Sequence, residues 1–65
     1  MMIKPMTGEE VRRVRTKLGL TQAQLAERLG VAPNSVYRWE ANRVAITPPM
    51  AQLIRLLGKE GRSRR

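Results

Sequence analysis

Three polar side chains at helical spacing carry the clearest chemistry of this 65-residue chain: the amide of Asn34, the phenol of Tyr37 and the guanidinium of Arg38. At about 100° per residue, a helix places them on one side and the apolar Val36 and Trp39 on the other. The major groove of duplex DNA admits a helix, where an amide pairs bidentately with adenine and a guanidinium with guanine. Each such pairing discriminates against a wrong base by about 1–3 kcal/mol. We therefore predict that Asn34 and Arg38 read base edges.

The neighbours of these two residues extend the same face. Ser35 and Tyr37 flank the pair and are candidates for contact with a base, a thymine methyl or a phosphate. Pro33, at the start of the helix, is placed with the base-reading candidates. An ordinary solvent-exposed helix face is the alternative interpretation. Trp39 shares the helical phase of Val36, which favours packing in the core over stacking on a base.

Contacts to DNA phosphates are predicted from residues beside the reading helix, because backbone contacts fix the register of a protein on the duplex. Thr21 and Gln22 stand at the start of a predicted helix, where side chains, backbone N–H groups and the helix dipole favour an anion. Asn42 and Arg43 follow the reading helix and are placed to hold a strand backbone. A helix C-cap and a solvated cation are the alternatives for these two. Arg28 is kept only as a further candidate.

The composition limits the chemistry that the chain can perform. A length of 65 residues allows one small domain, and 42% hydrophobic content is enough for a compact helical core. The absence of Cys and His excludes disulfides, thiolate or imidazole metal sites and the usual nucleophile–base pairs. The five carboxylates, all glutamates, show no spacing that requires a catalytic pair. We expect neither an enzyme nor a bound metal, cofactor or small-molecule ligand.

The formal charge of +8 favours a polyanionic partner over a merely solubilising surface. One Trp, one Tyr and no Phe provide few of the aromatic platforms typical of single-strand binders, so we expect double-stranded DNA. No apolar run approaches the ~18 residues of a membrane span, and the first residues lack the apolar region of a signal peptide. We therefore expect no membrane association and a cytoplasmic, nucleoid-associated location.

Two capping boxes predict the helices that lead up to the reading helix. Residues 1–6 are predicted to form an arm that packs partly on the body. The stretches 7–10 and 21–24 each begin with Thr and place Glu or Gln three residues later, which fits a capping box. Gly19 and Gly30 are expected to end the two helices. Residues at core spacing in them are Val11, Val14, Leu18, Leu25, Ala26 and Leu29.

A third and a fourth helix complete the predicted domain, which spans residues 7–58. The third runs over about 33–42, because proline is well placed at a first helical position. The fourth spans about 48–57, and Gly58 is expected to stop it. Residues 59–65 are expected to form a mobile basic tail. Residues expected to face inward from the fourth helix are Met50, Leu53, Ile54 and Leu57.

The stretch TQAQLAERLGVAPNSVYRWE, residues 21–40, pairs two apolar helix faces around Gly30. It resembles the helix-turn-helix unit of the Cro/repressor-like (XRE-type) family, which includes the DNA-binding domains of several antitoxins. Residues 15–22 are similar to the family's first-helix exit, and residues 39–43 to its recognition-helix exit. The resemblance covers roughly residues 7–58. It implies an all-α, compact four-helix domain of the lambda-repressor-like type.

The resemblance also implies roles for single residues. Asn34 and Arg38 match an Asn and an Arg, four apart, that make sequence-specific contacts in some antitoxin domains. Gln22 matches a glutamine that meets a phosphate. Arg15 and Glu40 resemble a partly buried ion pair that joins the first helix to the recognition helix and orients the reading face.

The chain departs from the family pattern at three points. Ala32 occupies the usual N-cap site of the recognition helix, where Ser or Thr is common, and this sacrifices about 1 kcal/mol of capping. Asn42 replaces a commoner Gly, although Asn tolerates a left-handed conformation. Many relatives have a fifth helix that supports dimerisation, so a homodimer on a palindromic site is not carried over directly.

These observations together predict a sequence-specific DNA-binding protein, a small transcriptional regulator that occupies an operator. An antitoxin-type module and an engineered DNA-binding scaffold of the same fold are the alternatives. A non-specific binder of RNA or other polyanions is less favoured.

Overall fold

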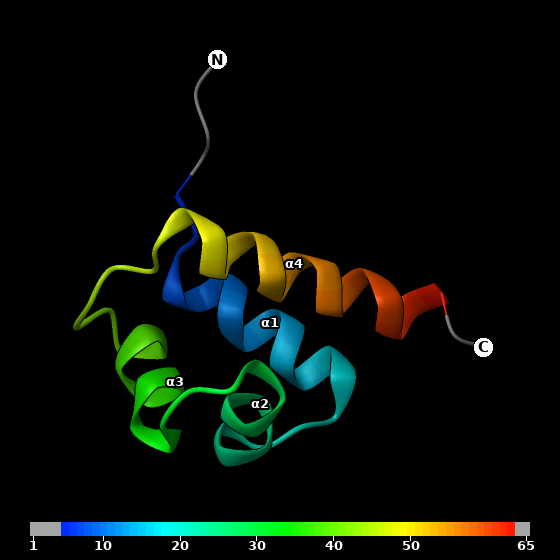
Figure 1. Ribbon diagram of the computed structural model, residues 1–65, viewed down its shortest axis with the longest axis horizontal. Coiled ribbons are helices and arrows are strands. Elements are labelled where there is room, and N and C mark those ends of the chain that lie inside the picture. Colours follow the sequence, from blue (N-terminus) through cyan, green and yellow to red (C-terminus); the bar gives the residue numbers. More distant parts are fainter. Residues whose placement is uncertain (1–4, 64–65) are drawn as a thin grey trace.

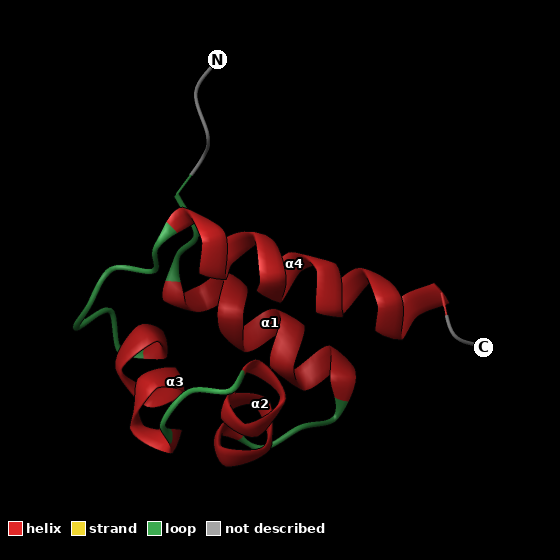
Figure 2. Ribbon diagram, viewed as in Figure 1, coloured by secondary structure: helices red, strands yellow, loops and turns green. Residues whose placement is uncertain are grey.

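Four helices joined by loops make up the part of the chain that the computed structural model describes, residues 5–63 (Figures 1 and 2). They are α1 (Gly8–Leu18), α2 (Gln22–Leu29), α3 (Pro33–Glu40) and α4 (Pro48–Ser63). Helix α1 packs on both α3 and α4, and α2 packs on α3. The predicted all-α, four-helix class is confirmed. None of these helices has the length and hydropathy that a membrane crossing requires.

Threonine side chains start the first two helices, as predicted. The Thr7 hydroxyl oxygen accepts a hydrogen bond from the Glu10 N–H at 3.2 Å. At α2 the capping box is complete, because the Thr21 oxygen accepts from the Gln24 N–H and the Gln24 side chain accepts from the Thr21 N–H. Each bond satisfies an N–H group that a helix start leaves unpaired. Local sequence therefore fixes where α1 and α2 begin.

The first three helices end in the same way, with one residue in the left-handed conformation. These residues are Gly19 (φ 71°), Gly30 (φ 76°) and Asn42 (φ 58°). The N–H of the next residue then donates to a backbone carbonyl oxygen in the last helical turn. These bonds run from Leu20 to Arg15 at 3.1 Å, from Val31 to Ala26 at 3.0 Å and from Arg43 to Arg38 at 2.9 Å. This is the Schellman motif, which Gly usually provides and Asn tolerates. The helix predicted to reach residue 42 therefore ends at Glu40, because Asn42 leaves the helical conformation.

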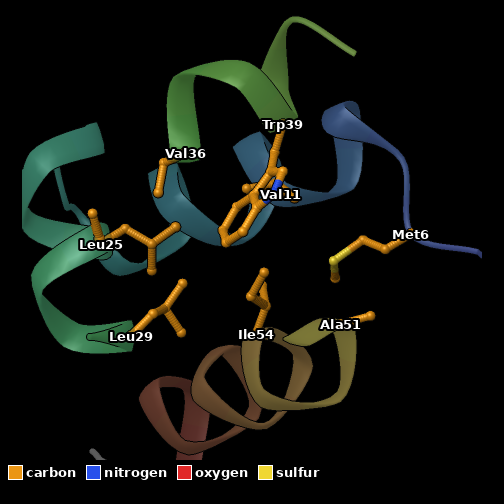
Figure 3. Packing of buried hydrophobic residues seen from close by; sticks show 9 residues of the cluster. Met6, Val11, Leu25, Leu29, Val36, Trp39, Ala51 and Ile54 are labelled. Atoms are coloured by element: carbon orange, nitrogen blue, oxygen red, sulfur yellow. The ribbon is translucent and has the colours of Figure 1, made fainter. Parts of the chain in front are cut away.

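The core is formed by side chains from all four helices and from the segment before α1 (Figure 3). Its buried members are Met6, Val11, Leu25, Ala26, Leu29, Val36, Trp39, Ala51 and Ile54. Met6 is 6% exposed, so the predicted packing of part of the arm is confirmed at this residue. The other apolar arm residues, within 1–4, lie outside the described residues.

Two predictions for α4 are wrong. The helix does not stop at Gly58 but continues to Ser63, so it takes in most of the predicted tail. A Cβ atom at Gly58 would lie 3.2 Å from a methyl carbon of Val14, which indicates that the glycine lets α4 approach α1 closely. Leu53, predicted to face inward, is 40% exposed, because the packed side of α4 is centred on Ala51 and Ile54.

Candidate nucleic-acid interface

Helix α3 presents a polar face to solvent and an apolar face to the core. Val36 is fully buried and Trp39 is 8% exposed, whereas Asn34 and Arg38 are exposed and Tyr37 is 52% exposed. In Figure 3 the Val36 and Trp39 side chains extend from α3 into the core. The predicted phase of the helix, with the indole inside and the amide and guanidinium outside, is therefore confirmed.

The start of α3 has no side-chain cap. Ala32 occupies the N-cap position with φ −65° and ψ 146°, and it offers no hydrogen-bonding side chain. Pro33 follows at the first helical position, where its missing N–H costs nothing, and it is exposed. Ser35 is half-buried, and its N–H donates to the Ala32 carbonyl at 2.9 Å. Of the two base-reading candidates in this turn, Pro33 is therefore more accessible than Ser35.

An ion pair between Arg15 of α1 and Glu40 holds the C-terminal end of α3. The Arg15 Nε donates to Glu40 Oε2 at 2.6 Å and its Nη2 to Oε1 at 3.1 Å, so the contact is bidentate. A third guanidinium nitrogen donates to the Leu20 carbonyl at 3.1 Å. The side chains are only 16% and 9% exposed. Charge-assisted bidentate pairs are short, strong and geometrically specific, so this contact restrains the orientation of α3.

The environment of Glu40 determines its acidity. Burial raises the pKa of its carboxyl, but hydrogen bonds from Arg15 and Gln22 and the charges of Arg15 and Arg12 outweigh this effect. The pKa of Glu40 therefore lies below its ordinary value. The same hydrogen bond raises the pKa of Arg15 above its ordinary value. Both groups are charged at neutral pH, and their pairing is intact there.

The residues predicted to hold phosphates take part in contacts within the protein. Thr21 caps α2, and the Gln22 amide nitrogen donates to Glu40 Oε1 at 3.1 Å. An amide nitrogen carries two hydrogens, so Gln22 keeps a second donor. The Asn42 side-chain oxygen accepts from the Gly8 N–H at 3.1 Å, which leaves its NH2 group as the available donor. Arg43 is exposed just beyond α3.

Gly8 is a positioning residue that the sequence analysis did not identify. A Cβ atom at this position would clash with the Trp39 carbonyl oxygen and would lie 2.8 Å from that of Glu40. Only glycine allows the start of α1 to approach the end of α3 this closely, and the approach brings the Gly8 N–H to Asn42. The available signal was a glycine in the first turn of a helix, where its propensity is poor.

Arg12 was also overlooked. It lies one helical turn before Arg15 on α1, is exposed, and its charge acts on Glu40. It lines two hollows beside the end of α3. The three-residue spacing from Arg15 was the signal that could have placed it on this side of α1.

Comparison with known proteins agrees with this architecture. A family model described as helix-turn-helix matches residues 11–57. The match runs from within α1 through most of α4 and includes Arg15, Glu40 and the whole of α3. No curated protein matches the chain.

Proposed function

Since this chain belongs to the Cro/repressor-like helix-turn-helix family, a family of DNA-binding regulators, we propose that it binds double-stranded DNA sequence-specifically. In this proposal α3 enters the major groove, and the protein regulates transcription by occupying an operator. The observation that carries the proposal is the exposure of Asn34 and Arg38 opposite the buried Val36 and Trp39.

Base reading is assigned to the two exposed groups with the most selective geometry. The Asn34 amide offers a donor and an acceptor to adenine, and the Arg38 guanidinium offers two parallel donors to guanine. Their four-residue spacing places them one turn apart on the same face of the helix. Pro33, Ser35 and Tyr37 border this pair and complete the proposed contact surface.

Phosphate contacts are assigned to the start of α2 and to the segment that follows α3. At the start of α2, the Thr21 hydroxyl and the second amide hydrogen of Gln22 would contact one backbone phosphate, together with the first N–H groups of the helix, which have no intrahelical partner. Beyond α3, the Asn42 NH2 group and the Arg43 guanidinium would hold another. The excess of eight positive charges supports this mode of binding, because phosphate contacts release counterions from DNA.

The proposal is tested by selecting preferred sites from randomised duplexes and then measuring two variants on the selected site and on a random duplex. Arg38→Ala should relax the preference at one base pair, with a loss of about 1–3 kcal/mol confined to the selected site. Arg43→Ala should weaken binding to both duplexes alike. Equal losses on both duplexes for Arg38→Ala would contradict the base-reading role.

The mass of the complex on the selected site determines the stoichiometry. A palindromic site bound by two chains would support a homodimer on DNA, whereas a short asymmetric site bound by one chain would support a monomer. Absence of any preferred duplex, together with strong binding to unrelated nucleic acids, would favour the alternative of a general polyanion binder.

A further inference from the structure

A hollow of about 180 Å³ opens where α1, the start of α2 and the end of α3 meet. One water molecule needs only about 10–15 Å³ of such volume, so the hollow has room for a larger group. It is lined by Arg12, Gln22, Tyr37, Glu40 and Ala41. Three of these side chains are hydrogen-bond donors: a guanidinium, an amide and a phenol.

The charge balance around this hollow is positive once Arg15, which pairs with the lining residue Glu40 but is not itself part of the lining, is counted. Both oxygens of Glu40 accept hydrogen bonds from Arg15, at 2.6 and 3.1 Å. Arg12 acts on Glu40 through its charge, and no hydrogen bond or ion pair joins the two among the described residues. Two guanidinium groups thus face one carboxylate, and Arg12 supplies the excess positive charge. An anion at the hollow would meet that charge and would not displace the Arg15–Glu40 pair.

We propose that Arg12, Gln22 and Tyr37 form a seat for one phosphodiester group of the DNA backbone, with Arg12 as its cation. The inference rests on the proposed function: the phosphate assigned above to the start of α2, with its contact to the second amide hydrogen of Gln22, is the one that Arg12 of α1 and Tyr37 of α3 also hold. The Gln22 amide hydrogen that is not bonded to Glu40 and the Tyr37 hydroxyl complete the donor set. Tyr37, which borders the reading face, is thereby assigned to the backbone and not to a base.

Arg13 provides a matched control for Arg12. The two residues are adjacent on α1 and both are exposed, but Arg13 is about 100° further round the helix and is not part of the lining of the hollow. Replacement of either by Ala removes one positive charge from the surface of the same helix. A difference between the two variants therefore reports the location of the charge and not its number.

The test compares the full-length wild type, Arg12→Ala and Arg13→Ala on a selected duplex and on a random duplex over a range of salt concentrations. Arg12→Ala should weaken binding about three- to tenfold on both duplexes and reduce the slope of log affinity against log salt by about 0.9, the value for one phosphate. Arg13→Ala should keep the wild-type slope. Equal losses and equal slopes for the two variants, with unchanged thermal unfolding, would overturn the proposal.

Tyr37→Phe tests the third member of the seat, because it removes only the hydroxyl. Its affinity should fall by a similar factor on the selected and random duplexes. A changed preference at one base pair would instead assign the hydroxyl to base reading and overturn this part of the inference. If the wild type bound the two duplexes equally, the proposed function itself would be refuted. The comparison of Arg12→Ala with Arg13→Ala tests the phosphate seat independently of that outcome.

Discussion

Helix α1 is tied to its two neighbours by the same chemistry in two different environments. Arg15 pairs with Glu40 of α3 at 2.6 Å, and the two side chains are 16% and 9% exposed. On the opposite side, Arg55 of α4 pairs with Glu10 at 2.9 Å, and the side chains are 34% and 29% exposed. Each pair uses two guanidinium nitrogens and both carboxylate oxygens. Water access is thus the main difference between them.

The comparison shows how burial changes the role of an ion pair. Loss of one partner from a buried pair leaves a charge without compensation, whereas an exposed pair is screened and its charges are solvated when separated. The α1–α3 contact is also extended by hydrogen bonds to Leu20 and Gln22, while α4 is held mainly by apolar packing around Ile54. The α1–α3 contact therefore orients α3, and the α1–α4 contact mainly stabilises the fold.

The largest effect that would test this contrast is expected for Glu40→Ala. It leaves the Arg15 guanidinium in a mostly buried position, so the free energy of unfolding should fall by about 3 kcal/mol. Chemical denaturation measures this change, and Glu10→Ala at the other junction is the matched control. An equal loss for the two variants would remove the distinction between the junctions.

A smaller but still substantial effect is expected for Gly8→Ala. The new methyl group meets backbone oxygens of α3, which cannot move aside as a side chain does. We expect a net loss of about 2 kcal/mol in unfolding free energy, even though alanine is the better helix former. Gly58→Ala is the control at the α4 junction, since the three atoms nearest to its methyl group all belong to the side chain of Val14. If it cost as much as Gly8→Ala, the two junctions would be equally rigid.

Lowering the pH provides a further test of the Arg15–Glu40 pair. The pKa of Glu40 is lower in the folded state than in the unfolded chain, so its carboxylate stabilises the fold above the ordinary Glu range near pH ~4.3. This contribution is lost as the pH falls through the folded-state value. The stability difference between wild type and Glu40→Gln should therefore shrink as the pH is lowered below about 4.3. A difference that is constant from neutral to acidic pH would contradict the shift.

The smallest effect is expected for Glu10→Gln. This substitution keeps the shape of the side chain and a hydrogen-bond acceptor for Arg55, and the pair is open to solvent. The unfolding midpoint should change only slightly, and added salt should diminish even that change. A drop comparable with that of Glu40→Ala, measured by thermal unfolding, would show that exposure does not separate the pairs.

Features governed by local rules could be predicted from the sequence. The Thr21–Gln24 capping box, the helix end at Gly30 and the burial of Trp39 each depend on residues within a few positions of one another. The class of the fold follows from them, because the apolar faces of successive helices have to meet.

Features that depend on contacts distant in the sequence could not be predicted in the same way. Gly58 has the sequence signature of a helix stop, but its role is set by Val14 on another helix. Gly8 and Asn42 are 34 residues apart, and neither reveals the other in a local pattern. Arg12 is one of several basic residues on α1, and only the packing of α3 distinguishes it from Arg13. The base and phosphate assignments remain predictions.

The chain contains a single tryptophan, and it is buried on the inner side of α3. Its fluorescence emission therefore originates from one place, the contact of α3 with the core. A red shift of this emission would report that the indole has reached water, and hence that α3 has separated from the core. No label on the protein is needed for this measurement.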